Sequence, residues 1–322
     1  MTELQDVWGW LVAIYLFLGG LGAGAFCVTA ILQLVTGGRF KVTIKFGAWT
    51  SVIAIVLGLL ALLLEVGKPF QAVVLFNSFV NFGSWMTIGA WLLVVALLVF
   101  TSYALLRTDR VVARLGRLWK PLEEKRSRLC TILAIIGIPI SLGVAIYTGI
   151  LIGVLPFIPF WNTWLLPALF TVSALDTGVA IVAANAILRE KVNGVARLKT
   201  AFEASIVALV AIEATVLWFY LQTMLTGSPD MAKSAQILTS GALSLPFWII
   251  VVSFGLAVPF LVGLIQLSRL VKRATVVLPL VGIAAALLGG FTLRFVVLSA
   301  GLHASISSPG LQQIFDGIKF IP

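Results

Sequence analysis

Long apolar runs separated by short polar segments dominate the chain. A helix needs about 20 mostly apolar residues to cross the hydrocarbon core of a bilayer. Eight runs reach that length, at residues 8–36, 46–66, 84–106, 130–154, 164–188, 201–225, 245–268 and 275–299. The pattern predicts an all-α polytopic membrane protein with eight transmembrane helices, which form a single integral membrane domain over residues 1–322. The first run is too long for the apolar part of a signal peptide, so we expect it to be retained.

Basic residues are distributed very unevenly among the segments between these runs. Eighteen of the 22 lysines and arginines lie in four alternate segments, 37–45, 107–129, 189–200 and 269–274. The opposite side carries only Lys68, Lys233 and Lys319. By the positive-inside rule, the basic segments are cytoplasmic and both termini are extracytoplasmic. The net charge of +10 therefore reflects membrane topology and gives no reason to expect nucleic-acid binding.

The composition excludes several classes of protein. Charged residues make up 11% of the chain, against about 25% in a soluble domain. This excludes a soluble globular enzyme, a disordered chain and a disulfide scaffold. Cys27 and Cys130 have no C-x-x-C partners, and His303 is the only histidine. The protein therefore lacks the ligands for an iron–sulfur cluster or a b-type haem, and we expect no haem and no metal in it.

The extracytoplasmic segments are unusually apolar. Residues 69–83 and 154–163 carry no charge, and the tail 300–322 is mixed. Apolar surface of this kind indicates either docking of a partner or entry of a lipophilic substrate. The alternative is that these segments pack on each other as interfacial helices.

Few ionisable or hydrogen-bonding groups lie within the apolar runs, and a charge inside a bilayer is costly enough to require a reason. Some of the candidates lie at the outer side and others near the middle of the membrane. They are Tyr15, Glu65, Tyr147, Asp176, Glu203, Glu213 and Arg294, together with Trp161 and Asn162 just before the fifth run. The glycine-rich stretch 19–25 favours close helix packing, with space for a flat ligand as the alternative.

Six sequence segments, in order, resemble the NrfD/PsrC family, the membrane subunits of polysulfide reductase-like complexes. They are WGWLVAIYLFLGGLGAGAF (8–26), LLLEVGKPFQAVVLFNSF (62–79), SWMTIGAW (84–91), AIYTGILIG (145–153), WNTWLLPALFTVSALDTG (161–178) and GGFTLRFVVLSAG (289–301). The resemblance implies two four-helix bundles, here residues 1–154 and 155–322 with the extracytoplasmic tail. It also implies a membrane subunit of an anaerobic respiratory complex in the cytoplasmic membrane of a prokaryote.

The resemblance further implies a subunit that reacts with a quinone or quinol, menaquinone being the preferred candidate, and that holds no prosthetic group. An iron–sulfur subunit with several clusters would dock on it, with a molybdenum or tungsten bis-pterin catalytic subunit beyond. By position, Tyr15, Glu65 and Tyr147 would line the quinone site. One departure from the family bears on Tyr15, since polysulfide reductase is expected to have a histidine at this position. A tyrosine can still donate a hydrogen bond to a quinone carbonyl, but it is a poor proton acceptor near neutral pH.

Quinone chemistry moves two protons with two electrons, so the site needs a proton acceptor and hydrogen-bond donors. We expect Glu65 and Tyr147 to carry the chemistry. The expected quinone contacts are Tyr15, Lys68, Trp161, Asn162, Arg294 and His303.

One expectation is a proton relay from the cytoplasm, formed by Asp176, Glu213 and Glu203. The alternative is that Asp176 and Glu213 are protonated packing groups with Arg294 as an ion-pair partner, and that Glu203 only faces lipid headgroups. The rival interpretations are a proton-coupled secondary transporter that uses Asp176, Glu213 and Arg294 at mid-membrane, and a scaffold that only anchors a partner.

Overall fold

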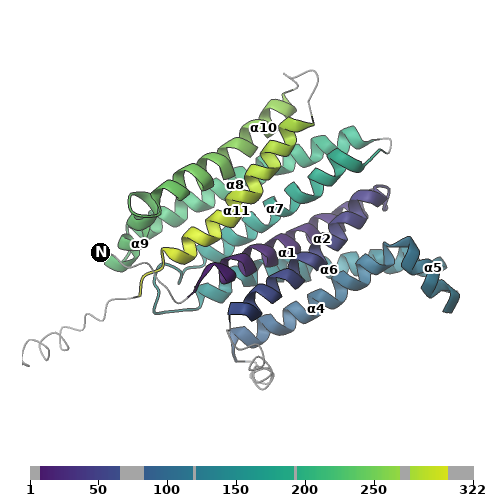
Figure 1. The fold of residues 1–322 in the computed structure, drawn as a ribbon, viewed down its shortest axis with the longest axis horizontal. Helices are drawn as coiled ribbons and strands as arrows, with labels where there is room; N and C mark the ends of the chain where they lie inside the picture. Colours follow the sequence, from purple (N-terminus) through teal and green to yellow (C-terminus); the bar gives the residue numbers. More distant parts are fainter. Residues whose placement is uncertain (1–7, 66–82, 119–120, 192–193, 269–275, 304–322) are drawn as a thin grey trace, which may run out of the picture.

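The computed structural model describes residues 8–65, 83–118, 121–191, 194–268 and 276–303, and no strand occurs in these ranges (Figure 1). The helices are α1 (Trp10–Thr36), α2 (Lys41–Glu65), α4 (Trp85–Leu106), α5 (Asp109–Leu118), α6 (Pro121–Gly153), α7 (Leu165–Arg189), α8 (Val195–Leu225), α9 (Pro229–Thr239), η2 (Pro246–Ala257), α10 (Val258–Leu267) and α11 (Val277–Ser299). Eight of the helical segments are long and apolar enough to cross a membrane, with η2 and α10 counted together. The predicted all-α, eight-span membrane protein is confirmed.

The spanning helices lie side by side, so that the molecule has two ends (Figure 1). The basic end carries the α1–α2 turn, α5 and the α7–α8 turn. The opposite end carries the start of α1, the end of α2 and α9, and we name it the outer end after the predicted topology. Glycines with positive φ shape the turns at the basic end: Gly37 (61°) and Gly38 (81°) end α1, and Gly194 (94°) precedes α8. Glycine adopts this conformation without the strain that a Cβ would add.

Helices of the two halves of the sequence pack within each half and also across the middle. Helix α1 packs against α2 and α6 of its own half and against α7 and α11 of the other. Helix α7 contacts α8 and α11, but also α2 and α6. Because α1 and α7 join the halves so closely, the division into two four-helix bundles stays a prediction.

Helical structure extends beyond the predicted spans at several places, among them the starts of α2 (Lys41 rather than residue 46) and α8 (Val195 rather than residue 201). Helix α6 begins at Pro121 rather than residue 130, and α5 and α9 were not predicted. The prediction followed long apolar runs, whereas α6 starts with proline and two acidic residues, a sequence that suits a helix N-terminus. Helix α9 starts at Ser228-Pro229, where the Ser228 hydroxyl caps the Met231 N–H.

The seventh span contains a π-helical first half, η2, which changes to α-helix at Val258. Pro259 follows at once and has no N–H to donate to the preceding turn. The Ser253 hydroxyl donates to the Trp248 carbonyl, five residues earlier. Gly255 of η2 meets Gly289 of α11 backbone to backbone, so this span packs closely on α11.

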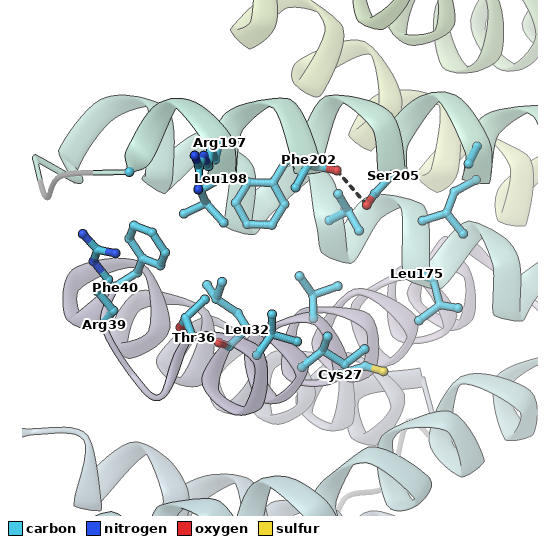
Figure 2. Close-up of a pocket in the computed structure, with 18 residues that line it drawn as sticks. Cys27, Leu32, Thr36, Arg39, Phe40, Leu175, Arg197, Leu198, Phe202 and Ser205 are labelled. Atoms are coloured by element: carbon cyan, nitrogen blue, oxygen red, sulfur yellow. Dashed lines mark hydrogen bonds between the residues drawn. The ribbon is translucent and has the colours of Figure 1, made fainter. Parts of the chain in front are cut away.

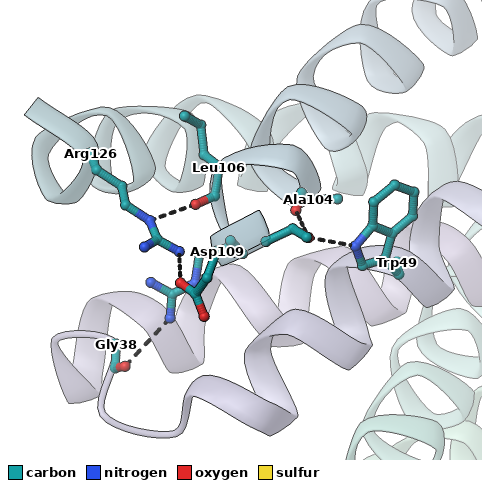
Figure 3. A network of polar contacts seen from close by, with 8 residues as sticks. Gly38, Trp49, Ala104, Leu106, Asp109 and Arg126 are labelled. Atoms are coloured by element: carbon teal, nitrogen blue, oxygen red, sulfur yellow. Dashed lines mark hydrogen bonds and ion pairs between the residues drawn. The ribbon is translucent and has the colours of Figure 1, made fainter. Parts of the chain in front are cut away.

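Polar contacts tie α5 to its neighbours at the basic end (Figure 3). The Arg126 guanidinium donates to the Leu106 carbonyl at 2.7 Å and pairs with the Asp109 carboxylate at 2.7 Å. The hydrogen bond from the Arg126 guanidinium to the Asp109 carboxylate holds the pKa of Asp109 below its ordinary value. The pair is therefore intact at neutral pH and is lost only as the pH falls through that lowered value. Asp109 is exposed, so the pair orients α5 and adds little stability.

Candidate functional site

Glu65 closes α2 at the outer end, and its carboxylate is held by the start of α1. Its Oε1 atom accepts a hydrogen bond of 3.1 Å from the backbone N–H of Gly9, the residue before α1. The unpaired N–H groups of a helix start favour an anion at this position. The side chain is half-buried. Glu65 is thus a positioned carboxyl group with only one oxygen engaged by the described contact.

Tyr15 and Tyr147 come from different helices to the same region. Tyr15 lies on α1 and is 2% exposed, and Tyr147 lies on α6 and is 5% exposed. The two phenols are close enough to interact electrostatically. The Tyr147 ring lies directly on Gly89 of α4, where any side chain would overlap it. Tyr15 is six residues, or about 9 Å along the helix, from the Gly9 amide that holds Glu65.

Trp161 is fully buried at the outer end, and its polar atom is already used. The indole N–H donates to the Val297 carbonyl of α11 at 2.9 Å, and the ring fills the space beside Gly301. The Trp8 ring lies 5.8 Å away, centroid to centroid. With its N–H bonded and its ring fully buried, Trp161 offers no free contact to a ligand in this structure.

Asn162 is exposed, and its amide donates to the Gly153 carbonyl at 2.8 Å. It lines a shallow hollow of about 290 Å³ with Trp85, Trp164 and Pro167, but the lining does not include Glu65 or Tyr147. His303 is exposed and stacks on Phe157 with centroids 5.9 Å apart. Lys68 lies outside the described residues.

The apolar segment 154–163 is largely packed into the protein. Ile158, Phe160 and Trp161 are buried, and the Tyr220 hydroxyl donates to the Phe160 carbonyl at 2.7 Å. Phe157 is half exposed. For this segment the structure favours packing over a partner surface. Most of segment 69–83 and of the tail 300–322 lies outside the described residues.

A second polar cluster lies between α7, α8 and α11, inside the membrane-spanning part. Asp176, Glu213 and Arg294 are 2%, 5% and 0% exposed. The Arg294 guanidinium donates to Ser173 Oγ at 3.1 Å, which is itself within hydrogen-bonding reach of the Glu213 carboxyl. Arg294 also donates to the carbonyls of Gly290 and Phe170, at 2.7 and 3.3 Å.

Asp176 completes this cluster through its interaction with the Glu213 carboxyl. Its Oδ1 atom is buried without a hydrogen-bond partner in the part of the protein that the structure describes. Glu213 thus lies close to both Asp176 and the Arg294 guanidinium, and the three ionisable side chains form one buried group. The structure brings together three residues that the sequence analysis had placed in separate spans.

Small residues make room for the Arg294 side chain. A Cβ at Gly20 would lie 2.9 Å from its Nη2, and Gly290 faces Ser173 and the same guanidinium. The rings of Phe17 and Phe170 lie 5.7 and 5.2 Å from the guanidinium carbon. The glycine-rich stretch of α1 therefore allows both close packing and burial of a charge.

Glu203 lies apart from this cluster. It is ten residues before Glu213 on α8, or about 15 Å along the axis. It lines a narrow gap of about 20 Å³ with Lys199 and Pro259. No group of three or more potential metal-ligating side chains occurs among the residues that the structure describes.

Sequence reasoning missed Gly9, Gly89 and Ser173. Gly9 contributes a backbone N–H, which every residue except proline has, so no sequence signal marks it. Gly89 is visible only as a small residue in an apolar run. Ser173 lies one turn before Asp176, and that spacing on a predicted spanning helix was the available signal.

Comparisons with known proteins find relatives over most of the sequence. A family model described as polysulphide reductase, NrfD matches residues 2–305. The C chain of polysulfide reductase from Wolinella succinogenes is 29% identical over 304 residues, a match that includes 92% of this protein and 94% of that one. Protein NrfD of Escherichia coli is 26% identical over 320 residues, with shares of 92% and 95%.

A third relative matches over a shorter part of the sequence. The C subunit of selenate reductase from Mesobacillus selenatarsenatis is 27% identical over 201 residues, which are 54% of this protein and 46% of that one. Two of these relatives are named as the C chain or C subunit of a reductase, which means that each is one of several chains of that enzyme. On the match to its family model, this multi-pass membrane protein belongs to the NrfD, or polysulphide reductase, family.

Proposed function

We propose that this protein is the membrane anchor and quinone-reactive subunit of a respiratory oxidoreductase complex. It would exchange electrons between the quinone pool, menaquinone being preferred, and an iron–sulfur subunit docked on the extracytoplasmic face. A molybdenum or tungsten bis-pterin subunit would lie beyond. The observation that carries the proposal is similarity, over 92% of the sequence, to the C chain of a polysulfide reductase. The carboxyl and two phenols at the outer end support it.

The proposed orientation follows from the basic residues. Helix α5 and the α1–α2 and α7–α8 turns, which belong to the basic segments, lie at one end of the molecule (Figure 1). We place that end in the cytoplasm of a prokaryote and the outer end outside. This puts Glu65, Tyr15 and Tyr147 on the same side as the proposed iron–sulfur partner.

The proposed chemistry assigns a separate task to each outer-end group. Glu65 accepts the two quinol protons one after the other and releases each on the outer side, as two electrons pass to the partner. Tyr147 donates a hydrogen bond to the quinone oxygen, and the buried Tyr15 hydroxyl orients that phenol. Asn162 and His303 are exposed and remain proposed contacts. Arg294 is deeply buried and bonded to its own cluster, and the N–H of Trp161 is occupied.

Glu65→Gln tests the proposal. An amide oxygen still accepts the hydrogen bond from Gly9, so the start of α1 is held while the proton acceptor is lost. We expect quinol-linked electron transfer in the intact complex to fall about 10²-fold, with partner binding and folding unchanged. Glu124→Gln removes an exposed carboxylate at the opposite end and is the matched control. Wild-type turnover in Glu65→Gln would contradict the assignment.

The second part of the proposal is that Asp176 and Glu213 pass protons through the membrane, with Glu203 nearer the cytoplasm. Secondary transporters bind substrate at breaks in their helices. Helices α7, α8 and α11 instead run without interruption past Asp176, Glu213 and Arg294. This continuity favours a proton relay over the alternative of a proton-coupled transporter.

A further inference from the structure

An elongated cavity of about 970 Å³ lies between α1 and α8, far from the outer-end site (Figure 2). Helix α7 packs against both helices and contributes Leu175 and Val179 to the lining. Most of the other lining side chains are apolar, among them Val28, Leu32 and Leu209. The hydroxyl of Ser205 donates to the Ala201 carbonyl of its own helix at 2.9 Å. The long part of the cavity therefore suits hydrocarbon rather than a polar ligand.

The cavity ends in positive charge at the basic end of the molecule. Arg39, after α1, and Arg197, in the first turn of α8, line this end from opposite walls, as Figure 2 shows. The Arg39 guanidinium reaches toward the α7–α8 turn, 3.7 Å from the position of a Cβ on Gly194. Both arginines are exposed, and within the described ranges neither guanidinium has a hydrogen bond or ion pair.

Acidic side chains near this mouth are directed elsewhere. The buried carboxylate of Glu190, at the end of α7, accepts two hydrogen bonds from Thr43. Glu203 lines the gap toward α10, behind α8. The two guanidinium groups therefore face the mouth without a described acidic partner, and an anion placed there would receive charge-assisted hydrogen bonds.

We propose that this cavity binds one anionic phospholipid, with its phosphodiester between Arg39 and Arg197 and its acyl chains between α1 and α8. The polarity gradient of the cavity matches that of a lipid, since the charged mouth lies where α1 ends and α8 begins and the apolar part runs into the spanning region. Basic pockets between spanning helices on the cytoplasmic side recognise anionic headgroups. A quinone would leave both arginines unpaired, because its ring has no negative charge.

The proposal is tested by lipid retention in the purified full-length protein. The protein is reconstituted into nanodiscs of phosphatidylglycerol or phosphatidylcholine with identical acyl chains, extracted into mild detergent and analysed by native mass spectrometry. We expect the wild type to retain one phosphatidylglycerol in preference to phosphatidylcholine. Arg39→Gln with Arg197→Gln should lower that retention about tenfold or more, because two charge-assisted hydrogen bonds are lost.

The matched control is Arg114→Gln with Arg117→Gln, which removes the same charge from exposed positions of α5. It should retain phosphatidylglycerol as the wild type does. A second variant, Ala208→Trp, keeps both arginines but fills the apolar part of the cavity, and it should also lose the lipid. Millimolar inorganic phosphate should not displace the lipid, since a free phosphate gains nothing from the apolar walls.

Four results would overturn the proposal. They are equal retention of the two lipids by the wild type, equal loss in both double arginine variants, full retention in Ala208→Trp, and recovery of a quinone in place of the phospholipid. Quinol-linked turnover in Glu65→Gln depends on the opposite end of the molecule, so the two proposals can fail independently.

Discussion

The residues around Arg294 show how a charge is accommodated inside the membrane. Its guanidinium is fully buried, donates three hydrogen bonds and lies between two aromatic rings. Removal of one partner of a buried charge network leaves the other charges uncompensated. Asp176 Oδ1 and Arg294 Nε are the atoms of this cluster that are buried without a described partner, and Asp176 is the one acid among these two residues. The cluster therefore has a rigid part, Arg294 with Ser173, and an acid that can exchange a proton with little rearrangement.

This difference predicts that Asp176→Asn changes proton movement more than stability. The side chain keeps its shape and loses no described hydrogen bond at Oδ1, so we expect the free energy of unfolding to change by less than about 1 kcal/mol. Proton uptake from the cytoplasmic side per quinone turned over should fall, because the relay has lost one of its acids. The measurement is pH change in sealed vesicles that carry the intact complex.

Glu124→Gln, at an exposed position, is the control for loss of a carboxylate. Unchanged proton stoichiometry in Asp176→Asn, with outer-side exchange only, would make the pair a packing feature. Transport of a solute by the isolated protein would instead favour the transporter alternative.

At the residue scale, the sequence indicated the acids and bases but not their partners. Asp176, Glu213 and Arg294 stand out because charges are rare in apolar runs. Ser173, which connects Arg294 and Glu213, does not, since serine is common in spanning helices. Glu65 was recognised as a carboxyl at a helix end, but its donor comes from a backbone 56 residues away. Only the tertiary structure brings such groups together.

At the scale of elements, one contact joins the end of α7 to the start of α2. Glu190 Oε2 accepts hydrogen bonds of 2.9 Å from the backbone N–H and the hydroxyl of Thr43, in the first turn of α2. The first N–H groups of a helix have no partner within the helix, and an anion there is also favoured by the helix dipole. Glu190 is 7% exposed, so water does not replace these bonds easily. It acts as a cap supplied by the other half of the sequence.

Loss of this cap should lower stability measurably. We expect Glu190→Gln, which keeps one acceptor oxygen, to lower the free energy of unfolding by about 1 kcal/mol, and Glu190→Ala by about 2 kcal/mol. Thermal unfolding of the purified protein in mild detergent provides the measurement. Glu124→Ala removes an exposed carboxylate at the same end and should have an effect within about 0.5 kcal/mol. Equal melting of Glu190→Ala and wild type would show that the contact contributes nothing.

The elements themselves were the part most accessible from the sequence. Each of the eight spans follows from a long apolar run, and the observed bounds differ mainly where polar residues extend a helix, as in α6. The short helices α5 and α9 are amphipathic or polar and have no such run. The pattern of apolar residues does not distinguish the π-helical half of the seventh span from an α-helix. That half depends on Pro259 and on the close contact between Gly255 and Gly289, which only the tertiary structure shows.

At the scale of the whole molecule, small residues let the two halves of the protein meet. Gly24 of α1 and Gly178 of α7 approach so closely that a Cβ on Gly24 would overlap the Ala174 carbonyl, and one on Gly178 would overlap Gly24. The overlapping atoms belong to the backbone, so a rotamer change cannot relieve the clash. Sequence analysis anticipated close packing of this stretch, but not that its partner would be α7.

This close contact between α1 and α7, here called the seam, predicts opposite effects of alanine substitution at two glycines that lie five residues apart on α1. Gly24→Ala must push α1 away from α7, and we expect it to lower the free energy of unfolding by about 1–3 kcal/mol. A Cβ on Gly19 would meet only the Thr148 methyl, at an ordinary 3.5 Å. Because alanine favours a helix over glycine by about 1 kcal/mol, Gly19→Ala should be neutral or stabilising.

Thermal unfolding of both variants in the same detergent measures the difference. Since helix propensity favours alanine at both positions, only the contact between α1 and α7 can separate them. If the two substitutions shift the melting temperature equally, the two halves are not held at this distance, and the position of the Arg294 cluster beside the seam would have to be revised with it. A selective loss in Gly24→Ala would show that the halves fold against each other as one body.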